Sequence, residues 1–330
     1  MSKRWFIIGS NSFSGASFIR YLLEKGETIA GCSRSMEEQA IFLPYKWTEE
    51  SHKFIFHQLD LNSDTKQIIN TIRDHQSEYV VNFAAQSMVA ESWLYPEQWY
   101  QTNVVANVRL HEGLRKIEKI KKYVHVTTPE VYGSCSGDVK EDAHFNPSTP
   151  YATSRAACDL HLMTFFKQYN FPVVFTRAAN VYGPGQQLYR IIPKTIFCIK
   201  SGMKLPLHGG GTSVRSFIHM SDVSEATRLI AEKGGLGECY HISTARMVSI
   251  RELVEMICSA MGVRFDEVIE VAGDRMGKDS AYRLDSSKIR YDLGWKDGIT
   301  LKNGISEVVS WMEKYWEQIK DIKPEYMHKA

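Results

Sequence analysis

Two short segments of the chain carry side chains that could move protons together. In the first, Thr128 and Glu130 follow an apolar run that is typical of a buried strand. In the second, Tyr151 and Arg155 stand four residues apart, so on a helix they share one face. A phenol beside a fixed cation, opposite a strand end with a hydroxyl and a carboxylate, is suited to acid–base chemistry. The plain alternative is an ordinary strand end followed by a capped helix.

The Tyr151 phenol needs help to act as a base, because a free tyrosine titrates near a pKa of ~10. A neighbouring cation favours the phenolate and lowers that pKa, and Arg155 would supply such a charge. Thr128 could then hydrogen-bond a substrate hydroxyl that Tyr151 deprotonates. Glu130 would be a second, separate base.

Two predicted elements must position these side chains. The apolar run 123–126 predicts a buried strand that ends just before Thr127. A helical pattern opens at Tyr151, with Pro150 directly before it and Thr149 as its cap. The site is therefore expected where this strand ends and this helix begins.

A second group of residues has the pattern of a dinucleotide-binding turn. A short apolar strand, 5–8, runs into the glycine turn 9–15 and then a helix, which is the context that such a fingerprint requires. Gly9 permits the tight turn, Gly15 lets the helix pack closely, and the helix N-terminus offers N–H groups to a pyrophosphate. Ser12 replaces the central glycine, and a plain β-turn-α unit is the alternative. The residues predicted to hold the dinucleotide here are Gly9, Asn11, Ser12, Phe13, Ser14 and Gly15.

The next predicted strand, 28–32, ends in Ser33, Arg34 and Ser35. Sites that prefer NAD place an acid here for the ribose hydroxyls, and this position has none. A guanidinium flanked by hydroxyls suits a 2′-phosphate. The sequence therefore favours NADP, with NAD as the alternative and a solvated surface arginine as the plain reading. An oxidised nicotinamide would add a second positive charge near Tyr151.

These motifs resemble those of the extended short-chain dehydrogenase/reductases, and within them those of the nucleotide-sugar 4,6-dehydratases of the dTDP-glucose and GDP-mannose types. The resemblance rests on the G-x-x-G-x-x-G spacing, interrupted only at Ser12, and on the Thr128–Glu130 and Tyr151–Arg155 segments. It covers nearly the whole chain. It implies an α/β fold, with a Rossmann-type doubly wound parallel sheet and a smaller α/β substrate-binding lobe. The expected division gives 1–178 to the dinucleotide-binding domain, with 214–240 returning to it, and 179–213 and 241–330 to the substrate lobe.

The resemblance also implies roles for residues outside these motifs. Asn103 is expected to hold the active-site backbone, and the helices 96–120 and 151–170 are expected to form a homodimer interface. Further cofactor contacts are expected from Asp60, Leu61, Ala84, Ala85 and Gln86, with Tyr151 and Arg155 at the nicotinamide ribose. The residues expected to bind a nucleotide-diphosphate sugar are Ser87, Glu130, Asn180, Arg190, Lys194, His208, Arg215 and Arg275.

The reaction depends on more than the fold, because this scaffold hosts epimerases, decarboxylases, reductases and dehydratases. A C4 ketone acidifies the C5 proton, and Glu130 could remove it so that water leaves from C6. Hydride returned to C6 would give a 4-keto-6-deoxy sugar. Glu130 therefore favours dehydration over simple 4-epimerisation, while decarboxylation stays open. Two departures from the family pattern, Pro129 for an aspartate and Arg155 for a lysine, keep a non-catalytic dinucleotide-binding protein as a further alternative.

Composition limits the remaining function classes. The chain has 330 residues, more than one core usually supports, so two lobes are expected. A net charge of +2 gives no argument for nucleic acid or an anionic membrane, and no apolar run reaches transmembrane length. Six scattered cysteines without a Cys-x-x-Cys pair indicate reduced thiols and a cytoplasmic location, and no metal site is predicted.

Overall fold

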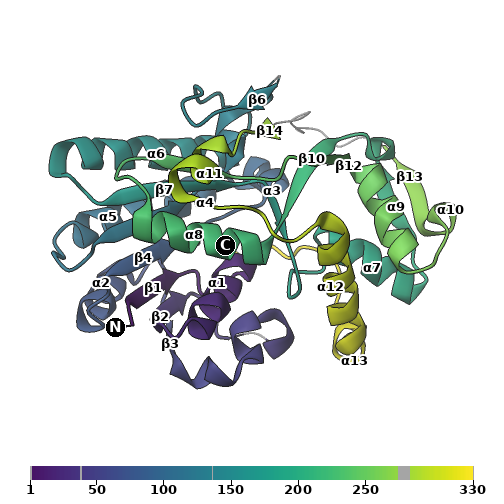
Figure 1. Cartoon of the computed structure of the whole chain (residues 1–330), viewed down its shortest axis with the longest axis horizontal. Coiled ribbons are helices and arrows are strands. Elements are labelled where there is room, and N and C mark those ends of the chain that lie inside the picture. Colours follow the sequence, from purple (N-terminus) through teal and green to yellow (C-terminus); the bar gives the residue numbers. More distant parts are fainter. Residues whose placement is uncertain (1, 38, 136, 274–282, 330) are drawn as a thin grey trace.

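The computed structural model describes residues 2–37, 39–135, 137–273 and 283–329. A large sheet with helices on both faces forms one part of the molecule, and short sheets and helices form a smaller lobe beside it (Figure 1). The predicted α/β class and Rossmann-type sheet are confirmed.

Seven parallel strands form the large sheet, in the order β11-β7-β5-β4-β1-β2-β3. The strands are β1 (Arg4–Ile8), β2 (Thr28–Ser33), β3 (Phe54–Gln58), β4 (Tyr79–Asn82), β5 (Lys122–Val126), β7 (Val173–Ala178) and β11 (Cys239–Ile242). From β1 the chain adds β2 and β3 on one side, and then returns to add β4 and β5 on the other. The carboxyl ends of β1 and β4 therefore flank a topological switch point, where ligands bind in such sheets.

Alternate side chains of β1 face two separate cores, as expected for a strand covered on both faces. Trp5 and Ile7 pack with one set of helices, and Phe6 and Ile8 with the other. The first set is α1 (Phe13–Glu24), α8 (Met220–Lys233) and α11 (Ser287–Leu293). The second set is α2 (Thr65–Asp74), α5 (Asn107–Leu114) and α6 (Pro150–Tyr169).

The stretch predicted as one helix over 96–120 has a more complex form. After α3 (Val89–Leu94) it begins as α4 (Pro96–Tyr100), widens into a π-helix over Gln101–Ala106, continues as α5 and ends at Leu114. The Asn107 amide donates to the carbonyls of Thr102, at 2.9 Å, and Asn103, at 3.3 Å. This side chain therefore satisfies backbone groups that the wider turn leaves without regular partners.

The smaller lobe contains two short sheets and five helices among the described residues. The first sheet joins β8 (Asn180–Tyr182), β10 (Val214–His219) and β12 (Met247–Ser249), and the second pairs β9 (Leu205–His208) with β13 (Ile269–Ala272). The helices are α7 (Ile191–Ser201), α9 (Ile250–Ala260), α10 (Phe265–Val268), α12 (Leu301–Lys314) and α13 (Trp316–Ile319). A further two-stranded pair, β6 (Asp138–Val139) and β14 (Arg283–Leu284), lies beside the large sheet.

The chain passes between the two parts without long linkers. Only Ala179 separates β7, in the large sheet, from β8, in the small one. The return to the large sheet, predicted over 214–240, includes β11, whose last residue is Ile242. The exact boundary between the two lobes remains a prediction.

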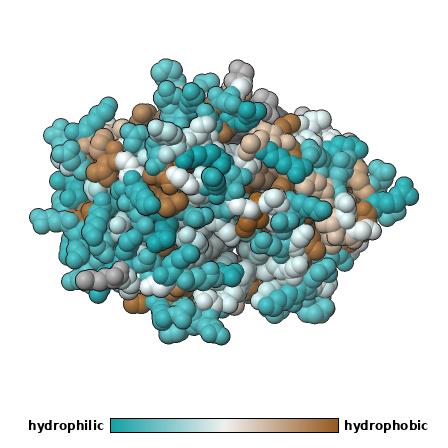
Figure 2. Space-filling view, in the orientation of Figure 1, coloured by the Kyte–Doolittle hydropathy of each residue, from teal (hydrophilic) through white to brown (hydrophobic). Residues whose placement is uncertain are grey.

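The surface of the face seen in Figure 2 is mostly hydrophilic, with hydrophobic residues in small scattered groups. Within the described part of the chain, no helix combines the length and the apolar character needed to cross a bilayer. All six cysteines carry free thiols.

Candidate active site

A pocket opens at the carboxyl ends of the strands around the switch point. Its wall includes eleven of the residues predicted to hold a dinucleotide: Gly9, Asn11, Ser12, Ser33, Arg34, Ser35, Asp60, Leu61, Ala84, Ala85 and Gln86. The other predicted cofactor residues, Phe13, Ser14, Gly15, Tyr151 and Arg155, lie outside this wall. Asn62 and Thr102 also line the pocket and bond to each other at 3.1 Å, although neither is among the predicted cofactor residues. Asp60 accepts a hydrogen bond from the Asn62 N–H two residues later, which is a common turn pattern. That pattern in the sequence could have indicated Asn62.

Two glycines bring the backbone of the turn close to its neighbours. Gly9 has a φ of +82°, and a Cβ atom there would lie 2.7 Å from the Ala84 nitrogen. A Cβ atom on Gly15 would lie 2.2 Å from the Gly9 carbonyl oxygen. The turn therefore has the close packing that a dinucleotide cradle requires, and the residues present fit such a cofactor.

Ser12, which replaces the expected central glycine, is the N-cap of α1. Its φ of −69° lies in a region open to any residue. The Ser12 hydroxyl accepts from the Gly15 N–H at 3.0 Å and donates to the Gly9 carbonyl at 2.7 Å. The departure from the family pattern therefore stabilises the helix start without distorting the turn.

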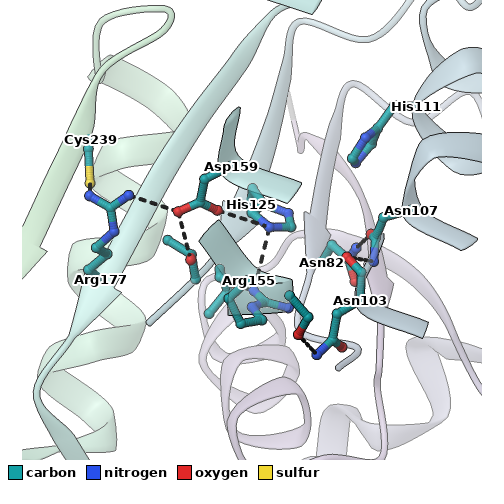
Figure 3. Close-up of polar contacts among 12 residues, drawn as sticks. Asn82, Asn103, Asn107, His111, His125, Arg155, Asp159, Arg177 and Cys239 are labelled. Carbon is teal, nitrogen blue, oxygen red and sulfur yellow. Dashed lines mark hydrogen bonds and ion pairs between the residues drawn. The ribbon is translucent and has the colours of Figure 1, made fainter. Parts of the chain in front are cut away.

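Asn103 ties the cofactor pocket to the helix that carries Tyr151 (Figure 3). Its amide oxygen accepts from the Gln86 N–H at 2.9 Å, and its nitrogen donates to the Gln86 carbonyl at 3.0 Å and to the Ser154 hydroxyl at 3.0 Å. Asn103 is fully buried in the π-helical stretch. Asn103 thus holds the backbone of the pocket wall at Gln86, and the active-site role that the resemblance implies remains a prediction.

The predicted acid–base residues lie on two adjoining helix starts. Thr149 caps α6, as predicted, by accepting from the Ala152 N–H at 3.1 Å. Thr128 caps a short 3-10 turn, Pro129–Tyr132, in which Pro129 occupies the first position. Proline suits that position because its ring presets the backbone and no N–H is needed there. This local geometry accommodates the residue that replaces the family's aspartate.

Tyr151, Thr128 and Glu130 are brought together. Burial, followed by the Glu130 carboxylate, raises the pKa of Tyr151 above its ordinary value. Arg155, a hydrogen bond with Thr128, and Arg190 act in the opposite direction and lower it. In the protein alone the raising effects prevail, so the phenol holds its proton at neutral pH.

The Arg155 guanidinium lies against the end of β5 rather than in the pocket wall. It is 3% exposed, donates to the Val126 carbonyl, and places Nη2 3.5 Å from His125 Nε2. The cation is therefore fixed at the strand end, from where it lowers the pKa of Tyr151. Its expected contact with the nicotinamide ribose remains a prediction.

A buried ion pair lies near Arg155 and His125 (Figure 3). Asp159, one turn after Arg155 on α6, accepts from Arg177 Nη2 at 2.8 Å and from the Thr127 hydroxyl at 2.9 Å. Burial, followed by Arg155, holds the pKa of His125 well below its usual range, so this ring is neutral. The Asp159 carboxylate thus pairs with Arg177, whereas Arg155 bonds to the Val126 carbonyl beside the neutral His125 ring.

His111, His125 and Cys158 form a buried cluster whose potential ligand atoms lie within 4.8 Å of one another. The Tyr123 hydroxyl lies 3.1 Å from His111 Nε2 and 3.4 Å from His125 Nδ1, and it accepts from Asn82 at 3.0 Å. Burial lowers the pKa of both histidines and raises that of the Cys158 thiol to about 12. The two histidine rings thus belong to a hydrogen-bond network around Tyr123, next to the Cys158 thiol.

Among the predicted sugar-nucleotide residues, Glu130 and Arg190 both act on the pKa of Tyr151, and Arg190 lowers it. Arg190 is exposed at the start of α7, and the Lys194 N–H closes the first turn on its carbonyl at 2.8 Å. His208 ends β9 and bonds through Nδ1 to the Gly273 carbonyl at 2.9 Å. Of the others, Asn180 begins β8, Arg215 lies half-buried in β10, Ser87 is exposed, and Arg275 lies outside the described residues.

Comparison with known proteins identifies the family. The family model described as GDP-mannose 4,6 dehydratase matches residues 6–308. The chain is 30% identical to the dTDP-glucose 4,6-dehydratase of Xanthomonas campestris pv. campestris, over 93% of this chain and 92% of that protein. It is also 30% identical to the human dTDP-D-glucose 4,6-dehydratase, over 83% of this chain and 79% of the relative.

Solved structures agree with this assignment. The dTDP-glucose 4,6-dehydratase of Streptomyces venezuelae, with NAD bound, superposes with a TM-score of 0.88 at 28% identity, over 96% of this chain and 98% of that one. The enzyme from Bacillus anthracis, also in complex with NAD, gives a TM-score of 0.86 at 29% identity, over 96% and 98%. The chain belongs to the GDP-mannose 4,6-dehydratase family of extended short-chain dehydrogenase/reductases, the nucleotide-sugar 4,6-dehydratases.

Proposed function

We propose that this enzyme converts a nucleoside-diphosphate hexose to the 4-keto-6-deoxy sugar, with Tyr151 and Glu130 as its two proton-transfer residues. The observation that carries this assignment is their proximity, which is close enough for the Glu130 carboxylate to raise the pKa of the Tyr151 phenol. The relatives act on dTDP-glucose by their names. A panel of nucleotide sugars would identify the nucleobase and the hexose of the substrate.

Tyr151 takes the proton of the sugar C4 hydroxyl, and Thr128 holds the phenol through their hydrogen bond. A bound oxidised nicotinamide supplies the hydride acceptor and a positive charge that lowers the pKa of the phenol. Arg155, held at the end of β5, adds a permanent positive charge that lowers the pKa of the phenol. The phenol, protonated in the protein alone, is thereby prepared to act as a base once the cofactor is present.

Glu130 then removes the C5 proton, which the C4 ketone has made acidic. Pro129 leaves no carboxylic acid at the position before it, so the protonated Glu130 also donates to the departing C6 hydroxyl. One carboxyl group thus acts as base at C5 and then as acid at the C6 hydroxyl. Return of the hydride to C6 and of a proton to C5 completes the 4-keto-6-deoxy sugar, and the proton that Tyr151 took from the C4 hydroxyl balances the one delivered to C5. Glu130 is half-buried, which limits access of bulk water to this proton.

The diphosphate of the substrate is assigned to the cationic side chains Arg190, Lys194 and Arg215, together with the Asn180 amide. Arg190 supports this placement, since its charge is felt at Tyr151. Guanidinium groups bind phosphate oxygens through paired hydrogen bonds. His208 is assigned to the base, with Ser87 near the sugar, and Arg275 keeps its predicted diphosphate role.

NADP is the proposed cofactor, with NAD as the alternative that the related structures contain. Arg34 lies in the pocket wall between Ser33 and Ser35. The first acid after β2, Glu37, pairs with Lys46 at 3.0 Å and accepts from Tyr45 at 2.9 Å. An acid already engaged in this way is poorly placed to bind ribose hydroxyls, which supports the 2′-phosphate assignment of Arg34.

A homodimer through the predicted helices is part of the proposal. Large exposed hydrophobic side chains gather on the segment 93–105 and on α6, namely Trp93, Leu94, Tyr95, Tyr100, Val105, Leu160 and Tyr169. Leu114, at the end of α5, belongs to the core. An apolar surface of this kind is typical of a protein–protein contact.

The test is a comparison of wild type with Glu130→Gln on a panel of UDP-, dTDP-, GDP- and CDP-hexoses, with NAD or NADP. Mass spectrometry of wild-type products should show loss of one water from one nucleotide sugar. Glu130→Gln should bind the dinucleotide normally and lose dehydration by at least about 10³-fold, within the range for general acid–base groups. Normal turnover in this variant would remove Glu130 from the mechanism, and an unchanged product mass with a new retention time would indicate epimerisation.

A further inference from the structure

The segment Tyr326–Lys329 crosses from the small lobe to the rim of the dinucleotide pocket. Figure 1 marks this end of the chain near the middle of the molecule, away from α13. The Lys329 carbonyl oxygen accepts two hydrogen bonds, from Arg34 Nη2 at 2.9 Å and from Gln86 Nε2 at 2.9 Å. Both donors line the pocket. One backbone oxygen therefore joins two strand ends of the large sheet.

A seated histidine holds this segment in place. The His328 ring stacks on Tyr95, with centroids 5.2 Å apart and planes at 4°, and on Trp99, at 5.4 Å and 12°. His328 Nε2 lies 2.6 Å from Gln98 Oε1, so that nitrogen donates. These partners lie in α4 and at the residue before it, a few residues after Gln86 in the chain.

Tyr326 connects the segment to the small lobe. Its ring packs edge-on against the ring of Tyr189, the residue before Arg190, with centroids 5.2 Å apart. The Tyr326 hydroxyl lies 3.4 Å from His328 Nδ1. Tyr326 and His328 are half-buried, whereas Met327 between them is 74% exposed. The alternation shows an extended segment with one face docked on the molecule.

We propose that Tyr326–Lys329 is a cofactor-positioning segment, which fixes Arg34 and Gln86 and thereby sets dinucleotide affinity. A guanidinium carries its donors in one rigid plane, so a bond to Lys329 fixes the orientation of the whole group. The Gln86 backbone is already held by Asn103, and the Lys329 carbonyl determines where its side chain points. The inference rests on the proposed role of the pocket as the cofactor site.

The carbonyl, not the lysine side chain, makes these contacts, which gives the test a matched control. His328→Ala removes the stacking that seats the segment, His328→Phe keeps a ring between Tyr95 and Trp99, and Lys329→Ala keeps the carbonyl. Isothermal titration calorimetry with NADP and NAD would give the dissociation constants. We expect His328→Ala to raise the NADP constant about tenfold, and the other two variants to stay within about twofold of wild type.

Thermal unfolding of each variant would check that the fold is retained, and kcat at saturating dinucleotide should change little. A second variant, in which 326–329 is replaced by Gly-Ser-Gly-Ser, should weaken binding at least as much as His328→Ala. Unchanged constants in both variants would overturn the proposal, and tighter binding would show that the segment obstructs the pocket instead. If the wild type binds a dinucleotide but dehydrates no sugar, the proposed reaction fails while this inference stands.

Discussion

The Asp159 carboxylate and the Arg177 guanidinium form a buried ion pair, with 2.8 Å between Oδ2 and Nη2, on the helix and strand that adjoin Tyr151. Asp159 is 2% exposed and Arg177 is 3% exposed. Arg177 also donates to the Tyr132 hydroxyl at 2.6 Å, so the pair connects α6 with the turn that carries Glu130. The Asp159–Arg177 pair thus links the helix that carries Tyr151 to the turn that carries Glu130.

Asp159→Asn should destabilise the fold strongly, because it leaves the buried Arg177 guanidinium without its counter-charge. Loss of one partner of a buried ion pair costs about 3–5 kcal/mol of unfolding free energy. Urea unfolding followed by circular dichroism would measure this change. The control is Asp138→Asn, since Asp138 pairs with Arg283 at the surface at 2.8 Å, where such pairs contribute about 0–1 kcal/mol. Equal effects in the two variants would contradict the structural role assigned to Asp159.

Arg155→Gln should move the acidic limb of the pH–rate profile to higher pH. Arg155 lowers the pKa of Tyr151, so its removal raises that pKa and reduces the phenolate fraction at any given pH. Turnover near neutrality should fall by about tenfold for each unit of pKa change. Arg155→Lys keeps the charge and should keep the position of the limb. A Gln variant with an unshifted profile would show that the charge does not act on the phenol.

Gly9→Ala should abolish tight dinucleotide binding. The new Cβ would meet the Ala84 nitrogen at 2.7 Å and displace the pocket wall. Gly26→Ala is a matched control, because Gly26 also has a positive φ, +75°, but nothing lies within 4 Å of its Cβ position. Both variants carry a backbone strain of roughly 1–2 kcal/mol. In a titration with NADP, only Gly9→Ala should raise the dissociation constant by more than about tenfold.

The protein should lose stability as the pH falls below about 6.5. Burial lowers the pKa of His219 to about 4 and that of His241 to about 3, so both stay neutral in the fold. As the pH falls, the unfolded chain binds these protons before the folded protein does. Each histidine therefore lowers the free energy of unfolding by up to ~1.4 kcal/mol per pH unit, until the pH reaches its pKa in the folded protein. Urea unfolding at pH 7, 6 and 5 would measure this slope.

His219→Asn should reduce the slope, since asparagine retains a capping side chain at the start of α8 but does not titrate. Substitution of the exposed His144 by Gln should leave the slope as it is. A wild-type stability that is constant from pH 7 to 5 would refute the expectation.

The elements nearest the chemistry could be predicted because their signals are local. A strand, a turn with Gly9 and Gly15, and a helix lie within about 20 consecutive residues, and the cap at Thr149 precedes the Tyr151 helix directly. The same holds for Thr128 and Glu130, which one short turn presents. For these residues the sequence pattern and the local backbone describe the same feature.

Other features depend on contacts between distant residues, and no local pattern indicates them. Arg34 and Lys329 are 295 positions apart, and the fold alone brings them together. The direction of the Arg155 side chain depends on the free carbonyl of Val126, and the π-helical stretch depends on the amide of Asn107. Helix periodicity predicted a continuous helix over 96–120. It does not register the side-chain bonds of Asn107 that accompany the π-helical stretch, and the observed helix ends at Leu114.

The single residue between β7 and β8 limits how this enzyme can be re-engineered. Because Ala179 alone joins the two sheets, at a bend, the strand with Arg177 and the strand with Asn180 are directly coupled. If the substrate lobe of another family member were inserted, its first strand would have to follow β7 with the same one-residue spacing. A compatible sequence within the lobe would not be enough. Exchange of specificity between relatives should therefore succeed by substitutions on the lobe's surface more readily than by transplanting the lobe as a module.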